Sequence, residues 1–156
     1  MKERLILGID IGGTNFRIGL VNSSGDLVGY KIESSSILVT EESDSLENLI
    51  KYIESYLTNN LGGTLYGIAI GFPSTVSKDK KTVYSTPNLN LTGFENVNVA
   101  DVISSRIKVP VFINKDVNLL LTYDLAKMNL DNNGITLGFY IGTGFGNSIL
   151  INGEFL

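Results

Sequence analysis

Residues 8–15 are Gly-Ile-Asp-Ile-Gly-Gly-Thr-Asn, and they stand between two apolar runs, Leu5–Leu7 and Phe16–Val21. Two apolar runs joined by a short glycine-rich turn predict a β-hairpin. The glycines let the backbone approach a ligand and present its N–H groups, which suit phosphate oxygens. Asp10 ends the first strand, where its carboxylate is placed to hold Mg²⁺ or the waters of Mg²⁺. The stretch therefore predicts a phosphate-binding hairpin, and a plain glycine-rich turn is the alternative.

The composition narrows the classes of function. The chain has 156 residues, 43% of them hydrophobic, which suits one ordinary domain with a genuine core. Its formal net charge is −4, and this acidic balance argues against nonspecific binding to nucleic acid. The basic run Lys78–Lys81 also contains an aspartate, and it predicts a solvated turn rather than a binding patch.

Cysteine and histidine are both absent from the sequence. Disulfides, thiol nucleophiles, Ser-His-Asp triads and Cys/His zinc sites are therefore excluded within this chain. A general base would have to be Asp, Glu, Lys or Tyr. No stretch is apolar over the length of a membrane span, and no signal peptide is recognisable. We expect a cytoplasmic protein with no membrane partner.

Hydrophobic periodicity predicts strands and helices in the order β-β-β-α-β-α-β-α, with a final strand–turn–strand unit. This order is typical of an α/β domain with a mixed sheet. The first helix is expected to begin at Asp44, a candidate N-cap with Glu47 three residues on. The predicted strands are residues 5–11, 16–21, 27–32, 66–71, 109–113, 135–141 and 148–151, and the two later helices are residues 98–107 and 116–127, the last with Leu119, Leu120, Tyr123 and Ala126 on one face.

Two further features belong with the opening turn. Asp116 follows an apolar strand and begins a helix, and Gly142–Gly146 forms a second glycine-rich turn between strands. Two such turns can hold two parts of a polyphosphate, and a carboxylate at a strand end can take a proton from a hydroxyl that attacks phosphorus. The alternatives are that Asp116 is a helix N-cap and that the second turn is an ordinary hairpin turn. Neither a dinucleotide fingerprint nor a P-loop is present.

Three motifs, in this order, resemble those of the ROK sugar kinases, which belong to the actin/hexokinase-like ATPases with ribonuclease-H-like halves. The motifs are Asp10–Asn15, Asn114-Lys115-Asp116-Val117-Asn118, and Gly142–Asn147 with Ile151-Asn152-Gly153 behind it. The resemblance covers essentially the whole chain. It implies a ribonuclease-H-like α/β domain with a mixed five-stranded sheet flanked by helices.

The resemblance also implies a reaction and its residues. The expected activity is transfer of phosphate from ATP, with Mg²⁺, to the 6-hydroxyl of a hexose, and no zinc site is expected within this chain. Asp116 would be the catalytic base, and Asp10 would hold Mg²⁺ through water. The phosphates of ATP would lie on Asp10, Gly12, Gly13, Thr14, Asn15, Gly142, Thr143 and Gly144, and the sugar on Asn88, Lys115 and Asp116.

The substrate can be narrowed by the same resemblance. The stretches 71–81, 85–89 and 115–119 are similar to those of kinases that act on D-allose, so D-allose is the first expectation. Glucose, fructose and N-acetylmannosamine are the alternatives. Most of the family has Asn where this chain has Lys115, and many members have Gly where it has Ser74. A cation at position 115 should change which sugar hydroxyls are read, and a nearby Lys115 would lower the pKa of Asp116.

The family's kinases have a second domain of similar size. We expect residues 1–132 to be the N-terminal ribonuclease-H-like domain, and residues 133–156 to be the first strands and phosphate hairpin of a truncated second domain. We therefore expect the 156-residue polypeptide alone to be inactive, and the full-length protein to form a homodimer. Two other classes remain: a sugar-responsive repressor, disfavoured because only four residues precede Leu5, and a binding module without catalysis, disfavoured by Asp10 and Asp116.

Overall fold

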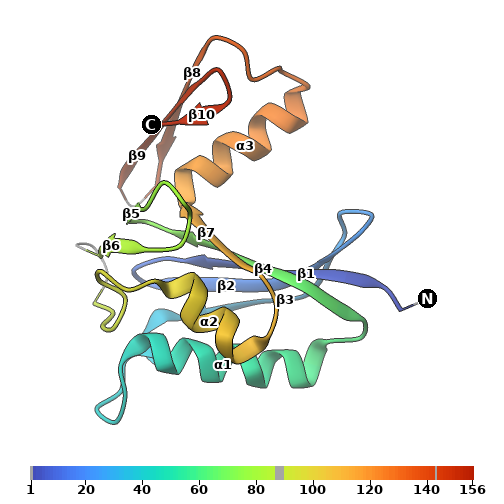
Figure 1. Cartoon of the computed structure of the whole chain (residues 1–156), viewed down its shortest axis with the longest axis vertical. Helices are drawn as coiled ribbons and strands as arrows, with labels where there is room; N and C mark the ends of the chain where they lie inside the picture. The colour runs from blue at the N-terminus through green and yellow to red at the C-terminus, as the bar shows by residue number, and fades with distance from the viewer. Residues whose placement is uncertain (1, 87–89, 143) are drawn as a thin grey trace. The chain divides into compact units, whose positions relative to one another are not determined.

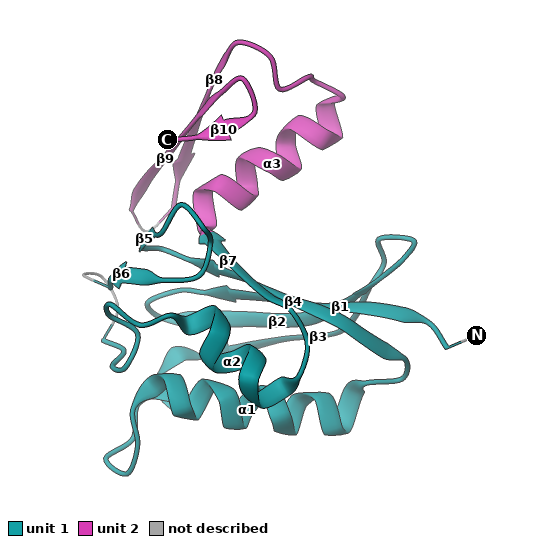
Figure 2. Cartoon of the chain, in the orientation of Figure 1, with its two compact units in different colours: residues 1–114 teal, residues 115–156 magenta. Residues whose placement is uncertain are grey.

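The computed structural model describes residues 2–86, 90–142 and 144–156. By the density of internal contacts the chain divides into two compact units, residues 1–114 (unit 1) and residues 115–156 (unit 2), coloured separately in Figure 2. The predicted domain boundary at residue 132 stays a prediction.

Unit 1 is built on a five-stranded mixed sheet (Figure 1). Strand β1 pairs antiparallel with β2 and parallel with β4, and β2 pairs antiparallel with β3. The strand order is β3-β2-β1-β4-β7, with bounds β1 (Arg4–Ile11), β2 (Asn15–Asn22), β3 (Leu27–Ser34), β4 (Thr64–Phe72) and β7 (Val111–Lys115). The predicted α/β class and the mixed five-stranded sheet are confirmed.

Helices α1 (Ser45–Asn60) and α2 (Val99–Ile107) lie against one face of this sheet (Figure 1). Asp44 is the N-cap of α1, as predicted, and its side chain accepts a hydrogen bond from the backbone N–H of Glu47 at 2.9 Å. Alternate strand residues meet the apolar faces of both helices, because side chains alternate between the faces of a sheet. The core includes Leu7, Ile9, Ile18, Leu20, Ile70 and Ile113 from the strands and Leu49, Ile53 and Ile103 from the helices.

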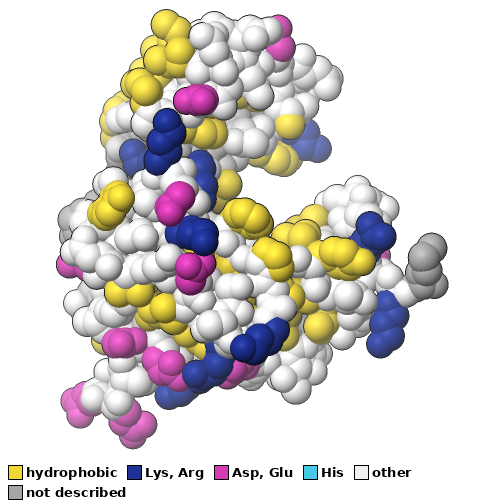
Figure 3. Space-filling view, viewed as in Figure 1, with side chains coloured by type: hydrophobic (Ala, Val, Ile, Leu, Met, Phe, Trp, Pro, Cys, Tyr) yellow, Lys and Arg dark blue, Asp and Glu magenta, His cyan; other side chains and the backbone are white. Residues whose placement is uncertain are grey.

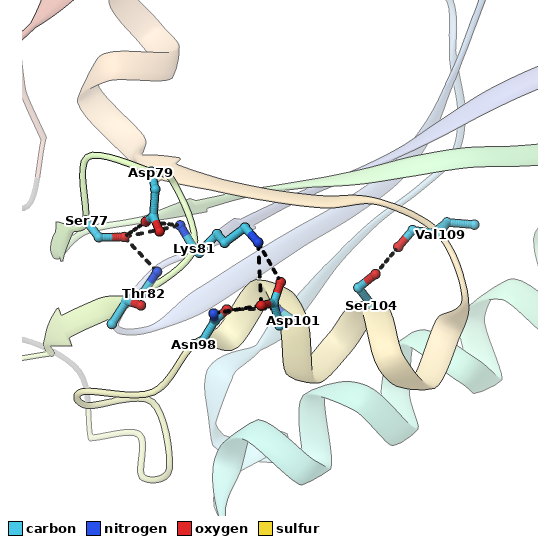
Figure 4. Close-up of polar contacts among 8 residues, drawn as sticks. All are labelled: Ser77, Asp79, Lys81, Thr82, Asn98, Asp101, Ser104 and Val109. Carbon is cyan, nitrogen blue, oxygen red and sulfur yellow. Dashed lines mark hydrogen bonds and ion pairs between the residues drawn. The ribbon is translucent and has the colours of Figure 1, made fainter.

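The basic run lies in the turn of a short hairpin, between β5 (Thr75–Val76) and β6 (Val83–Ser85) (Figure 4). The Ser77 hydroxyl accepts the backbone N–H of Thr82 at 2.8 Å, and the Lys81 ammonium pairs with Asp101 on α2 at 3.1 Å. The carbonyl of Lys80 accepts the N–H of Ile113 on β7. These contacts make the run a structural turn tied to its neighbours, in agreement with the sequence-based interpretation.

The described residues of unit 2 form one helix and a three-stranded sheet. The helix is α3 (Asp116–Met128), and the strands β8 (Ile135–Ile141), β9 (Phe145–Ile151) and β10 (Glu154–Phe155) lie in the order β10-β9-β8. The helix packs on the sheet through Leu121 and Leu125, which meet Leu150. The face with Leu119, Leu120, Tyr123 and Ala126 is exposed instead, so the face chosen from the sequence is not the packed one.

No helix among the described residues is long and apolar enough to cross a membrane.

Candidate functional site

The predicted phosphate turn is the tight connection between β1 and β2. The backbone N–H of Gly12 donates to the carbonyl of Asn15 at 3.0 Å, which closes the turn after the last strand pair, Ile11 with Phe16. A Cβ on Gly12 would lie 2.7 Å from the Asn15 carbonyl oxygen, so this position needs glycine. Gly13, Thr14 and Asn15 are exposed at the tip. The structure therefore brings these predicted residues together with their backbone open to a ligand.

Asp10 lies directly opposite Arg17 on the β1–β2 ladder. The Arg17 guanidinium donates to the Asp10 carboxylate at 2.8 Å, and both side chains are about half exposed, at 50% and 49%. The sequence analysis did not single out Arg17. The register of the predicted hairpin could have identified Arg17, because a turn closed by Gly12 and Asn15 places residue 10 opposite residue 17.

The donor set around Asp10 fits a metal shared with a nucleotide. Within the described residues no group of three or more Asp or Glu side chains could hold a metal ion. Magnesium is usually bound by one or two carboxylates together with substrate phosphates and water. A single accessible carboxylate beside an exposed glycine turn matches that pattern.

A groove opens beside the same turn. Its lining includes Gly13 and Thr14 from the turn, Ser34–Ser36 from the end of β3 and the 3₁₀ helix η1 (Ser35–Leu38), and Asn90. The groove carries hydroxyl and amide groups beside the apolar side chains of Val39 and Leu91, and none of its lining residues is charged. Its three serines were not predicted to belong to the site.

Asp116 is the first residue of α3, which follows β7 without a loop. The N-cap of this helix is Lys115, whose side chain makes no capping hydrogen bond, so the alternative that Asp116 is the N-cap is wrong. The Asp116 carboxylate accepts the backbone N–H of Val117 at 2.7 Å. A carboxylate in the first helical turn is favoured by the helix dipole.

The second glycine turn joins β8 and β9, and the N–H of Gly142 donates to the carbonyl of Gly144 at 2.9 Å. A Cβ on Gly142 or Gly144 would meet no atom within 4 Å. A Cβ on Gly146, in contrast, would lie 2.5 Å from Val117 Cγ1. The fold thus requires glycine where β9 crosses α3, and leaves the turn itself open to the close approach of a ligand.

A buried hydrogen bond ties this hairpin to the helix that Asp116 begins. The Ser148 hydroxyl donates to Asn118 Oδ1 at 2.6 Å, and both residues are buried. Together with the contact between Gly146 and Val117, this bond sets the base of the second turn against the first turn of α3. Asp116 and the second glycine turn are therefore neighbours within unit 2. The sequence analysis missed Ser148, for which the pattern carries no signal.

The structure describes some of the remaining predicted site residues and not others. Asn88 and Thr143 lie outside the described residues. Among the described residues on either side, Thr86 N–H donates to Glu95 at 3.0 Å and Thr92 N–H donates to the Ser45 hydroxyl at 3.1 Å. Asp10 and the first turn belong to unit 1, and Lys115, Asp116 and the second turn to unit 2.

The chain is similar in sequence to proteins of known families. The ROK family model matches residues 6–156. The glucokinase of Halalkalibacterium halodurans is 24% identical over 100% of this chain and 47% of its own length. The xylose repressor of Caldicellulosiruptor bescii is 27% identical over 72% of this chain and 28% of its own length.

The fold is shared with solved structures. A ROK family glucokinase from Streptomyces griseus, crystallised with glucose and AMPPNP, superposes with a TM-score of 0.72 at 21% identity, over 97% of this chain and 46% of that one. The chain spans about half the length of the curated glucokinases it matches, 47% in the first two.

Proposed function

Because the chain belongs to the ROK family, we propose that the protein transfers phosphate from ATP to the 6-hydroxyl of a hexose. The observation that carries this proposal is the arrangement in unit 2. A carboxylate begins a helix, and a glycine turn packed against that helix keeps Gly142 and Gly144 open although the fold does not need glycine there. Phosphoryl transfer depends mainly on positioning, on stabilisation of charge by a bound metal and backbone N–H groups, and on a base for the attacking hydroxyl.

The proposed roles follow the chemistry of the side chains. Asp116 accepts the proton of the attacking hydroxyl. Asp10 holds Mg²⁺ through water, and the metal, when bound, neutralises charge on the phosphates. The backbone of Gly12, Gly13, Thr14, Asn15, Gly142, Thr143 and Gly144 holds the phosphates, and Asn88 and Lys115 lie on the sugar side.

We propose D-allose as the hexose, with glucose, fructose and N-acetylmannosamine as the competing substrates. Lys115 supports a departure from glucose, because an ammonium offers only donors where an Asn side chain offers both a donor and an acceptor. A site that loses an acceptor should discriminate among epimers that differ in hydroxyl orientation.

The deciding experiment is a panel of these hexoses with ATP and Mg²⁺, run on the 156-residue chain and on the complete product of its gene. We expect the complete product to form D-allose 6-phosphate with the highest kcat/KM, and the 156-residue chain to show no turnover. Ordinary turnover by the chain alone would contradict the second expectation. Hexose binding without phosphate transfer by the complete product would contradict the kinase and favour a sugar-responsive binding protein, the class to which the matched xylose repressor points.

A further inference from the structure

The turn between β1 and β2 is braced by a serine from a distant segment. Ser35 begins η1, 23 residues after Gly12, and is only 3% exposed. Its hydroxyl donates to the carbonyl of Gly12 at 2.7 Å, and its backbone N–H donates to the carbonyl of Thr14 at 2.9 Å. One residue therefore fixes two carbonyls of the same short turn.

Fixing these carbonyls also fixes the N–H groups of the turn. In a planar trans peptide the C=O and N–H bonds point in opposite directions. The carbonyl of Gly12 shares a peptide plane with the N–H of Gly13, and that of Thr14 shares one with the N–H of Asn15. Because both carbonyls point toward Ser35, both N–H groups point away from Ser35.

We propose that Ser35 is a positioning residue for phosphate binding, which orients the N–H groups of Gly13 and Asn15 toward the nucleotide. The inference rests on the proposed function, because it takes phosphate as the ligand of this turn. Glycines are free to adopt many conformations, and a turn of Gly12 and Gly13 loses much backbone entropy when it is ordered by a ligand. A turn that is already braced avoids that loss at the moment of binding.

A second buried serine in unit 1 provides a matched control. Ser45, on α1, is as buried as Ser35, at 1% exposed, and its hydroxyl accepts the N–H of Thr92. Ser45→Ala therefore removes a buried hydrogen bond from unit 1 without touching the turn.

The test compares Ser35→Ala with Ser45→Ala in the complete gene product. Calorimetric titration with a non-hydrolysable ATP analogue and Mg²⁺ should show affinity weakened about tenfold in Ser35→Ala, the effect of losing one buried hydrogen bond. The KM for ATP should rise by a similar factor while the KM for the hexose stays unchanged. Ser45→Ala should lose thermal stability but bind the analogue as the wild type does.

Two results would overturn the inference: unchanged nucleotide affinity in Ser35→Ala, or an equal loss in Ser45→Ala. If the wild type itself fails to bind the analogue, the proposed function is contradicted. The effect of Ser35 on the conformation of the turn then needs a separate measurement. Amide exchange of Gly12 in the 156-residue chain then decides, since it should be about tenfold faster in Ser35→Ala than in Ser45→Ala. Equal exchange rates in the two variants would show that Ser35 does not hold the turn in place.

Discussion

Gly144 lies in the second glycine turn and Gly146 lies two residues later, in β9, and the structure places opposite demands on them. Gly146 lies where an added Cβ would clash with Val117, and Gly144 lies in open space. We expect Gly146→Ala to lower the free energy of unfolding by about 1–3 kcal/mol through overpacking. Gly144→Ala should leave stability nearly unchanged and weaken ATP binding. Urea unfolding and nucleotide titration of both variants check the pair, and the reverse pattern would remove Gly144 from the proposed site.

Asp116→Asn tests the proposed base. The amide keeps the size of the side chain but cannot accept the proton of the attacking hydroxyl. Removing a general base typically lowers kcat by about 10²–10⁴-fold. We expect that loss in the complete gene product with the dissociation constant of the hexose nearly unchanged, as measured by steady-state kinetics and calorimetry. Activity retained in Asp116→Asn would show that the base is assigned wrongly.

The sequence predicted part of the candidate site, but not the residues that hold the site in position. The spacing of Gly12, Asn15 and the flanking apolar runs predicted the hairpin. In that hairpin Asp10 lies opposite Arg17. No comparable rule leads to Ser35, because its contact with Gly12 depends on where β3 ends and η1 begins. Contacts of this kind follow from tertiary structure, on which sequence periodicity is silent.

Helix α3 shows the same limit at the scale of an element. Its existence and start were predicted from the apolar strand before Asp116, and its packed face was not. Apolar residues occur all round the helix, so several stripes fit the 3.6-residue period equally well. The contact with β9 selects Leu121 and Leu125, and this contact exists only once the hairpin is in place.

Strand β8 and helix α3 are also joined by Tyr140, whose hydroxyl donates to Asp124 at 2.9 Å. Burial and the adjacent Asp124 carboxylate raise the pKa of Tyr140 to about 12 from its ordinary value of 10.0. The folded state thus holds the phenolic proton more tightly than the unfolded state. The contact therefore contributes its full stability below pH 10 and loses it as the pH rises from 10 to 12.

Tyr140→Phe removes this titration from the folded state. We expect the variant to lose less stability than the wild type between pH 10 and 12, as measured by urea unfolding at the two ends of that range. Burial raises the pKa of Tyr52 in unit 1 as well, so some alkaline loss should persist in the variant. An identical decline in variant and wild type would show that the contact with Asp124 does not hold the proton.

At the scale of the whole molecule, the two units differ in how much apolar surface they bury. The core of unit 1 runs through β1, β2, β4 and β7 and both covering helices. The buried cluster of unit 2 contains Leu121, Leu125 and Leu150. The outward residues of β8 are apolar and exposed, up to 87% at Ile141, and Figure 3 shows hydrophobic side chains on the surface of this unit. Composition predicted a sufficient core for the chain and gave no indication of this uneven division.

Burial of apolar surface is the main source of stability, so the two units should not be equally protected. We expect backbone amides of α3, β8 and β9 to exchange with solvent about tenfold faster or more than those of β1 and β4 in the 156-residue chain. The buried bond between Ser148 and Asn118 lies in the weaker unit, so Ser148→Ala should accelerate exchange in unit 2 and leave β1 and β4 unchanged. Mass-spectrometric hydrogen exchange of wild type and variant measures both effects. Uniform exchange across the chain, or acceleration in both units, would show that the units open together and that the small cluster of unit 2 does not limit its stability.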